Sequence, residues 1–311
     1  MRLRRRRALA LTLVLLLGAG ATAFALTRPT SADADPPTAS PTAPSPESRT
    51  PTPPEETPEE TPTPPATPEP ALCDDPAVAR ALASGDDAEV VTAVGGGDAF
   101  REAVVSGDAP CLDLNEAGRM WVVVNKLNPL DPIDHWPAPQ AQPGNVRVVS
   151  GGGWLRADVA ADLDDLAGAV AADGAGRIGV DSAFRPYTFQ VDLYNGYVAS
   201  RGQAAADLRS ARPGHSEHQT GLAVDVVACG AGCGSHDSFR GTSQARWLVE
   251  HAWRYGFVVR YEDGMTDVTG YSWEPWHLRY IGTELAAAYH EGGFRTLEDF
   301  FGLPAAPDYA D

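Results

Sequence analysis

The stretch GHSEHQTGLAVD, residues 214–225, is the most informative part of this chain, because a polar, histidine-containing segment runs directly into a hydrophobic strand. Hydrophobic residues alternate along that strand: Leu222, Val224 and Val226. This period of two places them on one face, toward a core, and turns Asp225 to the other face. A buried carboxylate without a partner is costly, so Asp225 requires a cation or a network of donors.

Two histidines precede the strand and compete for a role beside Asp225. His218 lies an odd number of residues before Asp225, so an unbroken strand would send the two side chains to opposite faces. Gly221 lies between them and is the residue type that permits a sharp bend, which would let both face one ligand. His215, three residues before His218, is the alternative ligand.

A second cluster is EPWH, residues 274–277, whose last two residues begin a predicted strand at 276–281. Together, His218, Asp225 and His277 would offer two nitrogens and one oxygen to a tetrahedral Zn²⁺ ion. The fourth position would stay open for water, which is the ligand count of a catalytic rather than a structural site. Glu274 would then act as a base that moves a proton from this water to a leaving amine.

Arg185 is a further candidate, within SAFRPYTFQ, residues 182–190. It directly follows a predicted strand, and a guanidinium held there could bind a carboxylate or a developing oxyanion through two hydrogen bonds. The alternative is an ordinary salt bridge to one of the 42 acidic residues of the chain.

Three patterns occur in order along the chain: SxxRxxxxQ at 182–190, SxHxxGxAxD at 216–225 and ExxH at 274–277. They resemble the zinc D-alanyl-D-alanine carboxypeptidases of the VanY type, whose fold is shared with the hedgehog signalling domain. Asn125-Lys126, Leu130 and Trp136-Pro137 also resemble the opening segment of that family's domain. The resemblance covers roughly 115–303.

The resemblance implies a role for each matching residue. His218, Asp225 and His277 would hold one catalytic zinc ion, and His218 is favoured over His215. Glu274 would be the catalytic base, Arg185 would stabilise the oxyanion, and Ser216 and Gln190 would contact substrate. Tyr187, Trp273 and Trp276 are candidates for the pocket wall.

The implied function is an exported zinc-dependent carboxypeptidase that trims the terminal D-Ala of peptidoglycan stem peptides by attack of zinc-bound water. Two alternatives stay open. One is a peptidoglycan endopeptidase with the same site and a more open groove. The other is a non-catalytic zinc module that binds cell-wall fragments.

The order of elements predicts an α+β fold with a small, mainly antiparallel sheet flanked by helices, in a domain spanning 115–311. Strands are expected at 177–183, 221–227, 257–261 and 276–281. Helices are expected at 154–173, 188–200, 243–255, 283–291 and 296–301, and a loop at 203–217. Residues 71–114, which are rich in Ala and acidic residues, should form a small helical cap of unassigned role.

The N-terminal part has the composition of a targeting segment followed by a spacer. Five Arg in the first seven residues precede an uncharged stretch at 8–26, so 1–27 should be a signal peptide or a membrane anchor. Residues 28–70 contain 15 Pro in 43 positions and should form an extended stalk. We therefore expect the folded part outside the cytoplasm, secreted or attached to the membrane.

Net charge and cysteine content limit the partners. A formal charge of −18 argues against nucleic acid as a ligand, and we expect a monomer. An even number of cysteines in an exported chain favours disulfides, most simply Cys73–Cys111 and Cys229–Cys233. The competing interpretation is a zinc knuckle formed by Cys229, Cys233 and His236.

Overall fold

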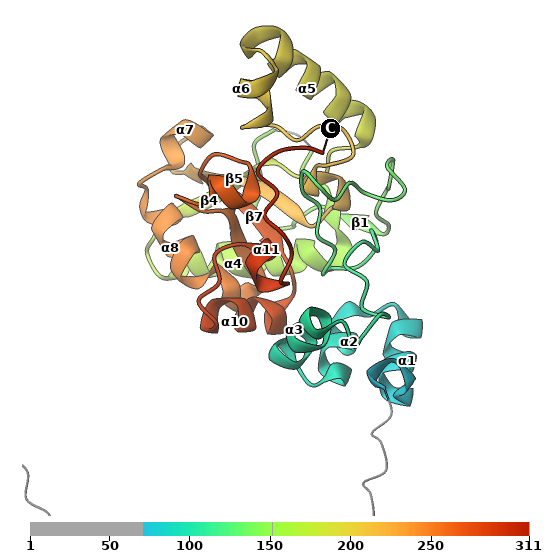
Figure 1. Ribbon diagram of the computed structural model, residues 1–311. Helices are drawn as coiled ribbons and strands as arrows, with labels where there is room; N and C mark the ends of the chain where they lie inside the picture. The colour runs from blue at the N-terminus through green and yellow to red at the C-terminus, as the bar shows by residue number, and fades with distance from the viewer. Residues whose placement is uncertain (1–70, 151, 311) are drawn as a thin grey trace, which may run out of the picture. The chain divides into compact units, whose positions relative to one another are not determined.

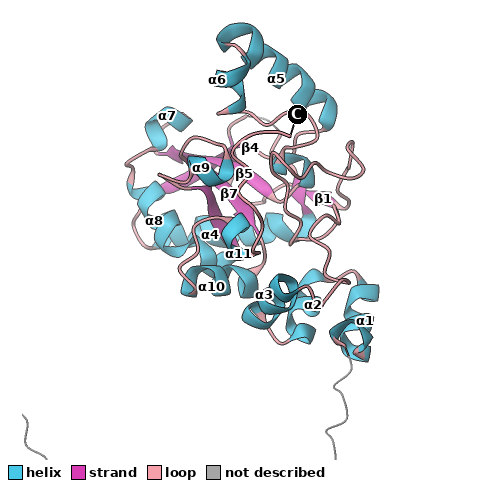
Figure 2. Ribbon diagram, viewed as in Figure 1, coloured by secondary structure: helices cyan, strands magenta, loops and turns pink. Residues whose placement is uncertain are grey.

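A five-stranded sheet, in the order β2-β4-β5-β7-β6, lies at the centre of the computed structural model (Figures 1 and 2). Its strands are β2 (Arg147–Val148), β4 (Arg177–Ser182), β5 (Ala223–Cys229), β7 (Glu274–Tyr280) and β6 (Phe257–Tyr261). The pairs β4–β5, β5–β7 and β7–β6 are antiparallel, and only β2 runs parallel to its neighbour β4. The predicted α+β class with a small, mainly antiparallel sheet is confirmed.

The structure describes residues 71–150 and 152–310. The predicted signal or anchor at 1–27 and the predicted stalk at 28–70 lie outside these residues. Among the helices that are described, none has the length and apolar character needed to cross a membrane.

The remaining elements are mostly helical. A two-stranded antiparallel sheet pairs β1 (Gln140–Ala141) with β3 (Leu155–Arg156). Three short 3-10 helices are η1 (Leu72–Asp74), η2 (Glu217–Thr220) and η3 (Ala252–Tyr255). The α-helices are α1 (Pro76–Ser84), α2 (Asp87–Val94), α3 (Gly97–Ser106), α4 (Ala157–Ala172), α5 (Tyr187–Arg201), α6 (Gln203–Asp207), α7 (His236–Phe239), α8 (Ser243–His251), α9 (Thr266–Thr269), α10 (Thr283–Glu291) and α11 (Leu297–Phe300).

Helix α4 covers the hydrophobic face of the sheet. Its side chains recur every three or four residues on one side, and this set is buried without exception: Val159, Leu163, Leu166 and Val170. They join a core cluster with residues of four strands, β4, β5, β6 and β7: Val180, Val224, Val226, Val259 and Leu278. Because these strand residues face α4, the residues between them in β5 and β7 point to the opposite face, where the polar site is built.

The N-terminal helices contribute to the same core. Helix α10 packs against α2 and α3, and Val90 and Phe100 belong to the core cluster. The approach of α3 to α10 is close, since a Cβ on Gly97 would lie 2.2 Å from the backbone oxygen of Glu284. A disulfide joins Cys73 to Cys111 and spans this helical segment, and a second joins Cys229 to Cys233. Both predicted pairings are confirmed.

Removal of the Cys73–Cys111 bridge is expected to destabilise the protein more than removal of the other disulfide. The first closes a loop with a sequence separation of 38 and the second one of 4. In the chain-entropy model this corresponds to about 4 kcal/mol for the long loop against about 2 kcal/mol for the short one. Urea unfolding of the two double Cys→Ala variants measures the difference. Equal losses would contradict this loop-entropy explanation.

The prediction of an uninterrupted loop at 203–217 is wrong. Helix α6 occupies Gln203–Asp207, and η2 begins at Glu217. The positive φ of Gly202 ends α5, and a run of three alanines after it then favours a new helical turn. Pro213 and Gly214 favour a loop, but only in the segment that follows α6.

Candidate functional site

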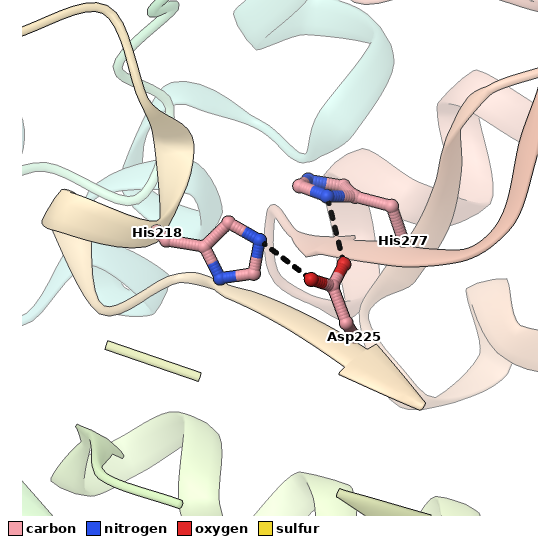
Figure 3. A group of neighbouring side chains, drawn as sticks. All are labelled: His218, Asp225 and His277. Carbon is pink, nitrogen blue, oxygen red and sulfur yellow. Dashed lines mark ion pairs between the residues drawn. The ribbon is translucent and has the colours of Figure 1, made fainter. Parts of the chain in front are cut away.

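Three buried side chains converge on the polar face of the sheet (Figure 3). His218 Nε2 lies 3.2 Å from Asp225 Oδ2, and His277 Nδ1 lies 3.1 Å from Asp225 Oδ1. One donor atom from each residue lies within 4.8 Å of the others, so the group could hold a metal ion. The sequence predicted this set of three, and the structure brings the residues together.

The backbone explains why they meet. In the antiparallel pair β5–β7, Asp225 is directly opposite His277, which places their side chains side by side on the same face. His218 comes from η2, which ends at Gly221 in the left-handed conformation with φ of 72°. A Cβ at Gly221 would lie 3.0 Å from the backbone nitrogen of Arg156, so the bend also requires glycine for space.

The hydrogen bonds of His218 prepare it to bind a cation. Its Nδ1 lies 2.8 Å from the carbonyl oxygen of Ala183. A carbonyl only accepts, so Nδ1 is the nitrogen that carries hydrogen, and Nε2 turns its lone pair toward Asp225. Nε2 of His218 and Oδ1 of Asp225 are buried without a hydrogen-bond partner. Nε2 of His218 faces Oδ2 of Asp225, and both atoms are acceptors. Two acceptors that face each other in this way fit a metal ion bound between them.

His277 is held from its other side by Glu217. Nε2 of His277 lies 3.1 Å from Glu217 Oε2, while Nδ1 faces Asp225. A carboxylate that accepts from one ring nitrogen fixes the ring orientation and makes the other nitrogen a better ligand. Glu217 is therefore a supporting partner of the candidate ligand set.

Glu217 belongs to a fully buried cluster of ion pairs. Its Oε1 accepts from Arg260 Nε at 2.8 Å and from Arg279 Nη1 at 2.9 Å. Arg260 forms two further hydrogen bonds to Glu298, at 2.8 and 3.0 Å. Two carboxylates thus balance two guanidinium groups, which is the condition for burying them at acceptable cost.

The sequence reasoning missed this cluster. The available signal was an arginine in each of two strongly hydrophobic strand segments, FVVRY at 257–261 and HLRYI at 277–281. A charged residue in such a strand requires a buried partner. The partner, however, lies far away in the sequence and can be identified only from the fold.

The electrostatics of the site follow from burial and pairing. Burial, aided by Arg185, lowers the pKa of His218 to about 4 and keeps this imidazole neutral. Burial also disfavours a charged His277, but its close contacts with the carboxylates of Asp225 and Glu217 outweigh this and raise its pKa to about 9. Burial would raise the pKa of Asp225, yet pairing with both histidines holds it well below the usual value.

Glu274 and Arg185 line a cleft of about 410 Å³ next to the three candidate ligands. The register of β6 and β7 shifts between Val259 and Tyr261, so β7 is irregular near its start, and Glu274 lines the same cleft as His277. Burial raises the pKa of Glu274 to about 7. Arg185 Nη1 is 4.0 Å from Asp225 Oδ2, and its Nε is buried without a partner.

The predicted substrate-contacting residues differ in their positions. Trp276 lines the cleft and stacks on His236, with ring centroids 5.0 Å apart. Ser216 is buried immediately before η2, and Tyr187 is half-buried at the start of α5. Gln190 has no exposed surface, and its amide nitrogen donates to Ser210 and Ala211. Gln190 is not among the residues that line the cleft, and its contact with a substrate stays a prediction.

The alternative metal ligands predicted from the sequence are engaged in other interactions. His215 bonds the carbonyl oxygen of Asn125 through Nδ1 at 2.8 Å and is not part of the candidate group. Cys229 and Cys233 are consumed by their disulfide, and His236 pairs with Asp181. The zinc knuckle considered for these residues is therefore not formed.

Comparisons with known proteins agree with this site. The VanY family model, described as D-alanyl-D-alanine carboxypeptidase, matches residues 152–283, a range that contains the three candidate ligands, Glu274 and Arg185. A D-alanyl-D-alanine carboxypeptidase of Enterococcus faecalis is 35% identical over 181 residues, which cover 55% of this chain and 62% of that protein. YodJ of Bacillus subtilis is 34% identical over 148 residues, covering 48% and 54% respectively.

A solved structure supports the same relationship. The LdcB LD-carboxypeptidase, a structure described as revealing peptidoglycan recognition, is 30% identical with a TM-score of 0.55. The match covers 60% of this chain and 87% of LdcB, whereas the chain spans less than two thirds of the length of the two curated relatives. On this evidence of sequence and fold, the chain belongs to the VanY family of carboxypeptidases.

Proposed function

We propose that this protein is a zinc-dependent D-alanyl-D-alanine carboxypeptidase that removes the terminal D-Ala of peptidoglycan stem peptides. The observation that carries the proposal is the convergence of His218, Asp225 and His277 beside a cleft that Asp225 and His277 line together with Glu274 and Arg185. Membership of the VanY family supports the same reaction and substrate.

In this proposal His218, Asp225 and His277 hold the zinc ion through two imidazole nitrogens and one carboxylate. A donor set of this kind suits Zn²⁺, and three protein ligands leave a position for a reactant. When bound, zinc acts as a Lewis acid that polarises the scissile carbonyl and lowers the pKa of a water molecule. Glu217 keeps the His277 ring aligned for this role.

Glu274 is the residue that transfers protons in this reaction. In its ionised form it takes a proton from the attacking water, and in its protonated form it returns that proton to the nitrogen of the departing D-Ala. A carboxyl group with a pKa of about 7 is suited to both steps near neutral pH. Arg185 supplies N–H donors for the oxygen on which negative charge develops.

We also propose that the folded part acts outside the cytoplasm. The basic and apolar N-terminal residues support export. The two disulfides fit an oxidising compartment. Peptidoglycan is the substrate that such a location would make accessible, either for a secreted enzyme or for one attached through 8–26.

A second candidate is an L,D-carboxypeptidase that shortens tetrapeptide stems. The likeness to LdcB favours it, because the name of that protein specifies cleavage of an L,D bond. The same metal site, base and arginine would serve both reactions, so the difference would lie in how the cleft holds the residue before the scissile bond.

Mass spectrometry of stem peptides incubated with the zinc-loaded full chain tests the proposal. We expect a pentapeptide ending in D-Ala-D-Ala to lose one alanine, and we expect a chelator to stop the reaction until Zn²⁺ is restored. Loss of alanine from a tetrapeptide alone would favour the L,D-carboxypeptidase, and internal cleavage an endopeptidase. An intact peptide with zinc demonstrably bound would contradict the enzymatic proposal and favour a binding module.

A further inference from the structure

The cleft extends beyond the candidate metal centre along a wall that has no assigned role. This wall is formed by the end of α5 and the turn after α6, which pack together and project from the sheet (Figure 1). Tyr197, Arg201, Arg209 and Ser210 line the cleft there, together with Arg185 at its inner end. Three guanidinium groups therefore surround one cleft of a chain whose net charge is −18.

Arg201 and Arg209 are free of acidic partners in the part of the chain that the structure describes. Within 71–150 and 152–310, neither forms an ion pair with an acidic side chain, although Arg212 close by is paired with Asp207 at 3.0 Å. The guanidinium of Arg201 lies over the ring of Tyr197, 5.8 Å from its centroid. Arg209 is near enough to the reacting end of the cleft to oppose the rise in the pKa of Glu274.

Acidic residues of the cleft lie on other elements. Asp181 comes from β4 and is engaged by Ser150 and His236, and Asp237 comes from α7. Asp225 and Glu274 belong to the reaction centre. The α5–α6 wall is thus the cationic side of the cleft, and an anionic group of a bound peptide would be attracted to it.

We propose that Arg201 and Arg209 form a carboxylate-binding subsite, for a peptide carboxylate that does not itself react. The inference rests on the proposed peptidase function and deepens it by giving the substrate class: a peptide with a carboxylate positioned to reach beyond Arg185. Guanidinium groups bind carboxylates through paired hydrogen bonds, which gives selectivity as well as affinity.

Two carboxylates of a stem peptide could occupy the subsite. One is the C-terminal carboxylate of the departing residue, and the other is a side-chain carboxylate of a residue before the scissile bond. Three pentapeptides distinguish them: one with both groups free, one amidated only on the side-chain carboxylate of its third residue, and one amidated only at the C-terminus.

The experiment compares kcat/KM for these peptides in the wild type, Arg201→Gln and Arg209→Gln. We expect the wild type to cleave the free peptide at least about 10-fold more efficiently than one of the amidated forms, the scale of a charge-assisted hydrogen bond. Both variants should lose most of this preference while cleaving that amidated form at the wild-type rate. Arg246→Gln is the control, because Arg246 is an exposed arginine on α8, which contributes nothing to this cleft.

The outcomes separate the subsite from simpler roles. Arg201 also places a positive charge at the end of α5, where it favours the helix, but that role would not alter discrimination between two peptides. The subsite is contradicted if the wild type does not discriminate at either carboxylate, or if both variants keep the full preference. Binding of the three peptides to zinc-loaded Glu274→Gln, measured by calorimetry, decides the question even if no peptide is cleaved, an outcome that would contradict the proposed reaction alone.

Discussion

Replacement of Glu274 by Gln should lower kcat by about 10²–10⁴-fold, the contribution expected of a positioned general base. The half-buried side chain lines the cleft with Asp225 and His277, and Gln keeps its size while removing its ability to accept and return a proton. Metal binding should be unchanged, because Glu274 is not among the three side chains whose donor atoms converge. Steady-state kinetics on a stem pentapeptide, with zinc content measured on the same sample, test both statements.

Asp237→Asn provides the matched control for charge. Asp237 lines the same cleft from α7 and is exposed, so its loss changes the charge of the cleft equally without removing a base. It should retain most of the activity. Comparable losses in both variants would attribute the effect to cleft charge, and full activity in Glu274→Gln would contradict the assigned mechanism.

Replacement of Glu217 by Gln should weaken both the metal site and the fold. The variant removes the negative charge that faces Arg260, Arg279 and His277. Arg260 keeps Glu298, but Arg279 loses the carboxylate that it faces, and leaving a buried charge unpaired is expected to cost about 3–5 kcal/mol of unfolding free energy. Loss of the carboxylate behind a metal-binding histidine is expected to reduce zinc affinity by about 10–100-fold. Urea unfolding of the metal-free protein and competition with a chromophoric chelator measure the two effects separately.

Glu298→Gln distinguishes positioning from stability. Glu298 pairs with Arg260 at 2.8 Å, so its loss disturbs the same buried cluster, but it makes no contact with His277. We expect a similar loss of stability with zinc affinity at the wild-type value. If both variants lose zinc affinity equally, Glu217 acts only through the stability of the fold and does not position His277.

Local patterns predicted the main strands and helices, and together with the family resemblance they predicted the grouping of the candidate ligands. The period of two in β5 placed Asp225 on the face opposite the hydrophobic core. The odd spacing between His218 and Asp225 required a bend, which Gly221 supplies. Helix α4 follows from its hydrophobic spacing, but it begins at Ala157, three residues after the predicted start at 154, because Leu155 and Arg156 form β3. The catalytic and substrate-binding roles of these residues remain predictions for the experiments above.

Long-range relationships were not predictable from one sequence. The pairing of Glu217 with Arg260 and Arg279 depends on the register between strands separated by loops of variable length. Gln190 belongs to a family-like pattern, yet the packing of α5 on the 210–211 segment buries it. The cationic wall likewise depends on how α5 and α6 are placed over the cleft, which hydrophobic periodicity does not specify.

The buried cluster behind His277 has a consequence for the order of events during synthesis. All three candidate ligands have been translated once residue 277 is complete, but the cluster that aligns His277 includes Glu298 from α11. A nascent chain ending between these two residues would contain every candidate ligand, but Glu217 would be the one carboxylate of the cluster facing both Arg260 and Arg279. We therefore expect the fold around the candidate ligands to reach its full stability only after α11 has emerged and docked, at a late stage of synthesis.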